Sequence, residues 1–117
     1  MPEAFGAAYQ DAERRFGGPL REVQTSATIG LVQSRIVEHD PERVSLTIVN
    51  WGAADVVAAI GANATLTAGI RVAGGGGFVT LSLVEDSTLV CQEFWGISSA
   101  AGNTVYVLAL RRETTSR

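Results

Sequence analysis

The stretch Arg43-Val-Ser-Leu-Thr-Ile-Val-Asn50 constrains the fold of this chain more than any other. Its β-branched residues lose side-chain freedom in a helix and pack well on a pleated sheet. Alternation along a strand places Val44, Leu46 and Ile48 on one apolar face and the semi-polar residues between them on the other. The stretch therefore predicts a strand with one buried side, which needs further strands as partners.

Composition agrees with a compact all-β domain. The chain has 117 residues, of which 46% are hydrophobic and 18% charged, which indicates one folded domain and argues against disorder. The net charge of −3 gives no electrostatic reason to bind nucleic acid. No apolar run is long enough to span a bilayer, and no secretory signal is expected at the N-terminus. Cys91 is the single cysteine, so we expect no internal disulfide and a small buried side chain in a strand.

An amphipathic helix is predicted for residues 2–16, with an apolar stripe at helical spacing formed by Phe5, Tyr9, Ala12 and Phe16. Gly17-Gly18-Pro19 ends this helix, and residues 20–27 are expected to be a polar connector. We divide the chain into an arm with its connector at 1–24, a sandwich domain at 25–112 and a frayed tail at 113–117. A helix of this length is marginal alone, so the stripe either packs on its own domain or docks on another chain.

Six further strands are predicted by apolar alternation and turn residues, at 28–37, 55–60, 69–72, 78–84, 88–97 and 104–110. The strand at 55–60 is expected to pair back on 43–50 as a hairpin. About seven strands with turns every 8–12 residues are typical of a small antiparallel β-sandwich, jelly-roll or Greek-key-like, or of a small barrel. The expected core consists of single strand faces: Leu46, Ile48, Leu81, Leu83, Trp95, Ile97, Val105 and Val107.

Residue patterns that carry chemistry are weak in this sequence. His39 lies in a polar turn without a second histidine, so a metal site is not expected. The glycines at 74–77 lack the lysine of a phosphate-binding loop. The adjacent Glu85 and Asp86 would face opposite ways in a strand, so they are not expected to form the carboxylate pair of a glycosidase. The tryptophans at 51 and 95 are expected in the core, with a protein interface or stacking on a sugar or a base as alternatives. We therefore expect no catalytic residue, cofactor or metal, and a protein that is not an enzyme.

Between Ser26 and Leu110 the chain resembles small structural proteins encoded in the head-gene clusters of tailed bacteriophages. The resembling stretches are Pro41–Asn50, Ala68–Ile70, a glycine turn into Phe78–Leu83, Glu85-Asp86, Leu89-Val90, Glu93–Ile97 and Val105–Leu108. Proteins of this type are small β-sandwiches on virion surfaces, where they serve as capsid decoration, cement or fibre-base proteins. The predicted N-terminal helix lies outside the resemblance.

The resemblance implies a non-enzymatic capsid decoration protein that binds the major capsid protein and stabilises the head. Such a protein is made in the cytoplasm of the bacterial host, lies on the capsid surface of the virion and is expected to be a homotrimer. The alternatives are a tail, baseplate or fibre component, a carbohydrate-binding module and a small enzyme. Outward Ser45, Thr47, Thr80 and Ser82 would allow close subunit packing. The residues expected to contact the capsid or a neighbouring subunit are those of the arm: Phe5, Tyr9, Ala12, Arg14, Arg15 and Phe16.

Overall fold

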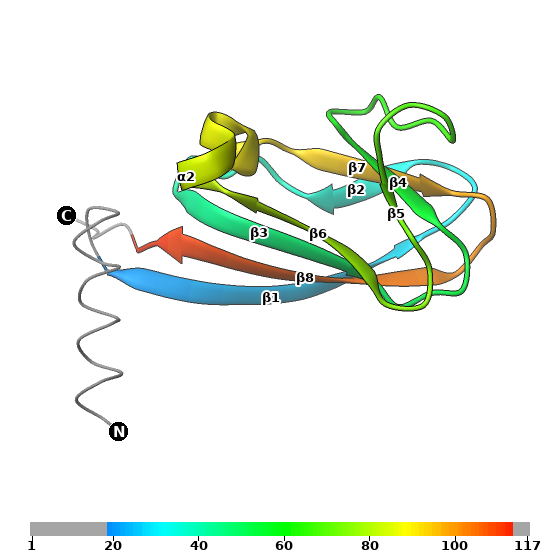
Figure 1. The fold of residues 1–117 in the computed structure, drawn as a ribbon, viewed down its shortest axis with the longest axis horizontal. Helices are drawn as coiled ribbons and strands as arrows, with labels where there is room; N and C mark the ends of the chain where they lie inside the picture. The colour runs from blue at the N-terminus through cyan, green and yellow to red at the C-terminus, as the bar shows by residue number, and fades with distance from the viewer. Residues whose placement is uncertain (1–18, 114–117) are drawn as a thin grey trace, which may run out of the picture.

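The computed structural model describes residues 19–113, which form two antiparallel four-stranded sheets that face each other (Figure 1). Sheet A has the strand order β1-β8-β3-β6, and sheet B has the order β2-β7-β4-β5. The strands are β1 (Leu20–Ile29), β2 (Ser34–Val37), β3 (Arg43–Asn50), β4 (Val56–Ile60), β5 (Ile70–Val72), β6 (Gly77–Ser82), β7 (Phe94–Ser98) and β8 (Asn103–Arg112). A short helix, α2 (Leu83–Asp86), and a 3-10 helix, η1 (Ser87–Cys91), connect β6 to β7. The predicted all-β class is confirmed, with eight strands in place of seven.

The strands pair as a set of nested hairpins. Strand β1 pairs with β8, β2 with β7, β3 with β6 and β4 with β5, each time antiparallel. The two sheets are then completed by the pairing of β3 with β8 and of β4 with β7. The described ends of the chain therefore lie side by side, with Leu20 opposite Arg112. None of the described helices is long and apolar enough to cross a membrane.

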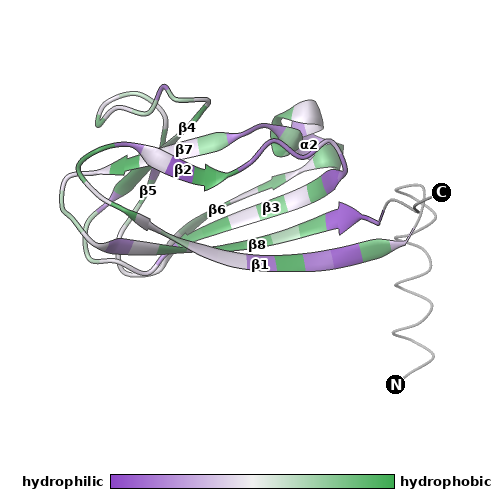
Figure 2. Ribbon diagram, turned by 180° about the vertical axis from the view of Figure 1, so that it is seen from behind, coloured by the Kyte–Doolittle hydropathy of each residue, from purple (hydrophilic) through white to green (hydrophobic). Residues whose placement is uncertain are grey.

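Residues 20–27 were predicted to be a polar connector. This prediction is wrong, because these residues belong to β1. Strand β1 pairs with β8 over all of its ten residues. It is polar because it lies at the edge of sheet A, where outward residues meet water and only alternate positions face inward (Figure 2). The single strand predicted at 28–37 is likewise wrong, because the chain leaves sheet A after Ile29 and enters sheet B at Ser34.

The predicted hairpin between 43–50 and 55–60 is also wrong. Strand β3 already has β6 and β8 as its two neighbours, and β4 lies in the other sheet between β7 and β5. Buried asparagine side chains stabilise the segment in which the chain crosses from sheet A to sheet B. The Asn50 side chain donates to the carbonyls of Ala54 (2.8 Å) and Val72 (3.0 Å), and Asn103 Oδ1 accepts from the Ala54 amide (3.0 Å).

Residues 83–91 are helical, contrary to the strands predicted at 78–84 and 88–97. Strand β6 stops at Ser82, whose hydroxyl accepts a hydrogen bond from the Glu85 amide (3.2 Å). The Asp86 carboxylate in turn accepts from the Ser82 amide (2.9 Å). Reciprocal bonds of this kind start a helix, so the apolar residues after Ser82 do not continue the sheet. Cys91 is buried as expected, but it lies in η1 and not in a strand.

The core between the sheets agrees with most of the prediction. Leu46, Ile48, Leu81, Val105 and Val107 are buried, and Leu83 packs half-buried against them. The prediction is wrong for β7, where Phe94, Gly96 and Ser98 face inward, so the intervening tryptophan and isoleucine are only half-buried.

The reason lies at Gly96. A Cβ atom at this position would be 2.8 Å from Ile36 Cδ1, so close packing between the sheets favours glycine on the inward side of β7.

Candidate interaction surfaces

The outer face of sheet A carries an exposed aromatic surface. Val49 on β3 lies opposite Phe78 on β6 and Tyr106 on β8, and Trp51 follows β3 with its ring near Gly76. Trp51 is 65% exposed and Phe78 is 67% exposed. We call the surface formed by Val49, Trp51, Phe78, Tyr106 and Leu108 the aromatic face.

The aromatic face is continuous with small hydroxyl residues and carries no charge at its centre. Thr47 lies opposite Thr80 and Leu108, and the two threonine hydroxyls are 3.2 Å apart. Within the described strands β3, β6 and β8, the outward positions are uncharged until Arg112 at the end of β8. Depletion of charge together with exposed aromatic rings is typical of the centre of a protein interface.

The expected core position of Trp51 is wrong. Asn50 is fully buried, and alternation therefore turns the next residue outward, to the side of Val49. This signal was present in the sequence. Trp95 is half-buried, and its indole N–H donates to the Glu93 carboxylate. The exposure of Trp51 fits a protein interface, and it also fits the alternative in which a tryptophan stacks on a sugar.

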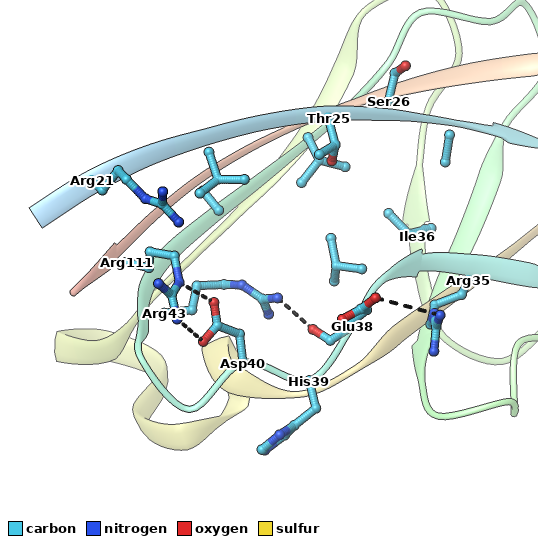
Figure 3. Close-up of a pocket in the computed structure, with 15 residues that line it drawn as sticks. Arg21, Thr25, Ser26, Arg35, Ile36, Glu38, His39, Asp40, Arg43 and Arg111 are labelled. Atoms are coloured by element: carbon cyan, nitrogen blue, oxygen red, sulfur yellow. Dashed lines mark hydrogen bonds and ion pairs between the residues drawn. The ribbon is translucent and has the colours of Figure 1, made fainter. Parts of the chain in front are cut away.

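The second surface is an open trough of about 730 Å³ between the inner face of β1 and β8 and the segment 35–40 (Figure 3). Its apolar floor consists of inward residues from two paired strands: Val23, Ala27, Val107 and Ala109. The trough exists because β2 has four residues whereas β1 has ten, so sheet B covers this part of sheet A only in part. Val23 and Ala27 are consequently only half-buried.

One end of the trough is built from a charged network. Arg111 binds Asp40 through two hydrogen bonds, Nε to Oδ2 at 2.8 Å and Nη2 to Oδ1 at 3.1 Å. The buried Arg43 guanidinium donates to the carbonyls of Val90 (3.0 Å), Gln92 (3.2 Å) and Glu38 (2.6 Å). Arg43 thus ties η1 and the end of β2 to β3, and it fixes the wall of the trough.

These contacts shift the acid–base equilibria of the network. The hydrogen bond from Arg111 holds the pKa of the Asp40 carboxyl below its ordinary value, and the same bond raises the pKa of Arg111. Burial lowers the pKa of Arg43. Local sequence patterns do not predict this network, because its members come from segments that are distant in the chain and carry no local motif.

The rim of the trough is rich in arginine. Arg21 lies opposite Arg111 in the register of β1 and β8, and it makes no ion pair within residues 19–113. Arg35 and Glu38 form an exposed pair at 3.8 Å. In Figure 3 the Arg21 side chain points toward Arg111, whereas His39 points away from the trough. The trough therefore presents an apolar floor with a cationic rim at the end where the described chain begins.

The predicted contact residues Phe5, Tyr9, Ala12, Arg14, Arg15 and Phe16 lie outside the described residues. His39 is exposed, as expected for a turn residue, and the described part of the chain has no group of acidic, histidine or cysteine side chains suited to a metal ion. The outward positions of Ser45, Thr47, Thr80 and Ser82 agree with the sequence analysis, and all four border or extend the aromatic face.

Comparisons with known proteins show a likeness of fold. No family model matches the sequence, and no curated protein matches it. Among solved structures, the chain is similar to a protein of Bacillus endospore appendages, which form a novel family of disulfide-linked pili. The two share 15% identity with a TM-score of 0.54, and the match covers 82% of this chain and 88% of the other. At this identity the likeness bears on the β-sandwich architecture alone.

Proposed function

We propose that this chain is a structural subunit that attaches to a protein lattice through the aromatic face, as a decoration protein on a phage capsid. The observation that carries the proposal is the exposure of Trp51 and Phe78 on an uncharged sheet face. Aromatic residues at the centre of an interface contribute most of its binding energy, and a monomer has no folding reason to expose two of them side by side.

The strand order supports the same proposal. Nested hairpins with the orders β1-β8-β3-β6 and β2-β7-β4-β5 have the arrangement of an eight-stranded jelly roll. Jelly rolls recur in viral capsid proteins and in lectins, so the fold suits a virion protein. In this proposal the partners are the major capsid protein and further copies of the chain in a homotrimer.

A second candidate function is a subunit of a fibre, in a tail, a baseplate or a pilus-like filament. The likeness to the endospore pilus protein favours it. Cys91 marks a difference from disulfide-linked pili, because it is the one cysteine of the sequence and it is buried, with its thiol donating to the carbonyl of Arg43 at 3.3 Å. A fibre built from this chain would therefore be held by noncovalent contacts.

Co-sedimentation with capsids tests the proposal. The protein is mixed with expanded capsids of the encoding phage, produced from a phage whose gene for this protein has been deleted. The fraction of protein that pellets with the capsids is measured against protein concentration. Saturable binding is the expected result. Absence of binding, together with filaments of the protein alone in negative-stain electron micrographs, would favour the fibre subunit. Binding to a glycan array that is lost in Trp51→Ala would favour the carbohydrate-binding alternative.

A further inference from the structure

We infer that the trough is the receptor for residues 2–16 of a neighbouring copy, which would join copies into a ring. This inference rests on the proposed function as an assembling subunit and names the contact that holds the copies together. The trough is an incompletely covered part of the sandwich. Its floor residues on sheet A face inward and β2 covers them only in part, so Val23 and Ala27 stay half-buried, whereas Val107 and Ala109 are buried. A domain of packed layers is completed when an amphipathic element covers such a face.

The dimensions of the two parts agree. A helix of 15 residues is about 22 Å long at 1.5 Å per residue. The trough runs along β1 from Arg21 on the rim to Ala27 on the floor, which corresponds to about 20 Å at 3.4 Å per residue. The stripe of Phe5, Tyr9, Ala12 and Phe16 therefore has room to lie along the whole floor.

The chemistry of the two parts is complementary. The stripe supplies three aromatic rings for an apolar floor of valine and alanine. The trough is lined by four arginines and two acidic residues, and Asp40 is already bound by Arg111. The segment 2–16 contains Glu3, Asp11 and Glu13 besides Arg14 and Arg15, a net charge of −1, and its carboxylates are suitable partners for the arginines of the rim. Desolvation beside the apolar floor strengthens such pairs relative to fully exposed ones.

The short hinge favours docking between copies over docking within one chain. Residues 17–19, which we call the hinge, are Gly-Gly-Pro, and the Pro19 carbonyl is held by the Glu113 amide at 2.7 Å. Proline fixes one backbone dihedral. To enter the trough of its own chain, the segment 2–16 would have to reverse direction using the backbone dihedrals of the two glycines alone. A short connecting segment promotes the exchange of an element between copies, and head-to-tail exchange gives a ring where the rotation between copies closes.

Mixed cysteine variants test the inference directly. In a Cys91→Ser background, one protein carries Ala12→Cys on the stripe and a second carries Ala27→Cys on the floor of the trough. The two are mixed and oxidised, and the disulfide between them is quantified by mass spectrometry. The matched control for the second protein is Gln24→Cys, which lies on the outward side of the same strand. We expect the Ala12–Ala27 cross-link to form at least about tenfold faster than the control cross-link, because docking raises the effective concentration.

Equal rates for Ala27→Cys and Gln24→Cys would overturn the inference. A chain carrying both Ala12→Cys and Ala27→Cys that forms only an internal disulfide would also overturn it, since the segment would then dock in its own trough. Insertion of four Gly-Ser residues into the hinge should shift the mass in light scattering from oligomer toward monomer. Capsid binding without the cross-link would refute the contact between the trough and residues 2–16 and leave the proposed function standing. The cross-link without capsid binding would support this contact and refute the proposed function.

Discussion

Removal of the two most exposed aromatic rings of the aromatic face, by Trp51→Ala and Phe78→Ala, should abolish attachment and leave the fold intact. About two-thirds of each side chain is exposed in the free protein. An aromatic side chain buries about 150–250 Å² when it is covered, so a partner can remove about 100–170 Å² from water at each ring. At about 25 cal/mol per Å², this area corresponds to about 2.5–4 kcal/mol per ring before ordering costs.

The binding assay is the co-sedimentation with capsids described above. Each single variant should weaken binding about 30-fold, and the double variant at least about 100-fold, since 1.4 kcal/mol corresponds to a factor of ten. The free energy of unfolding should fall by about 0.5 kcal/mol for Trp51→Ala and by up to about 1 kcal/mol for Phe78→Ala, which loses its cross-strand contact with Val49.

The matched control is a pair of exposed apolar residues away from the aromatic face, Val84 and Leu89 on α2 and η1. Val84→Ala and Leu89→Ala should leave capsid binding within about twofold of the parent, because an exposed side chain outside an interface contributes little binding energy. If the double variant of the aromatic face bound as tightly as these controls, the aromatic face would not be the contact.

Further predictions concern stability and assembly. Leu46→Ala and Ile48→Ala should each lower the free energy of unfolding by about 2–5 kcal/mol in denaturant titrations, since both residues are fully buried, and unchanged midpoints would refute the core assignment. Arg43→Met should lower the free energy of unfolding by about 3 kcal/mol or more, because three carbonyls lose their hydrogen-bond donor. A smaller loss than that of Arg43→Lys would contradict this role of Arg43. Asp40→Asn should cost about 1–2 kcal/mol at neutral pH. Because the pKa of Asp40 is lowered in the folded protein, its contribution to the free energy of unfolding is fully present above the ordinary carboxyl pKa of 3.8. This contribution is lost as the pH falls through the lower pKa of the folded state. Thermal melts of parent and variant should therefore converge in acid. Multi-angle light scattering at micromolar concentration should give three chain masses, and a strictly monomeric species would contradict a trimer formed in solution.

Local alternation was enough to predict the strands that have one apolar face. The bounds of β3 are those expected from the sequence, and the inward side of β3 and β8 was predicted correctly, because both lie at the centre of sheet A, where one face is buried and the other is not. The exposure of Trp51 followed from the same alternation and was missed, since large aromatic residues are more often buried.

Other features depend on contacts that no local pattern encodes. The polar strand β1 is stabilised by β8, which lies about eighty residues away in the chain, so its own composition indicated a connector. Leu83 and Val84 directly after Ser82 are apolar and would fit a strand, but the capping bonds of Ser82 and Asp86 start a helix there. The trough arises from the different lengths of β1 and β2, which becomes visible only when both sheets are assembled.

A cryo-EM reconstruction of the particle from which the protein comes tests the proposed function most directly. We expect density for the sandwich on the outside of a capsid shell, with the outer face of sheet A against the major capsid protein and Trp51 and Phe78 at the contact. Density in which the aromatic face points to solvent, or a shell that lacks the protein while tails or fibres contain it, would contradict the account.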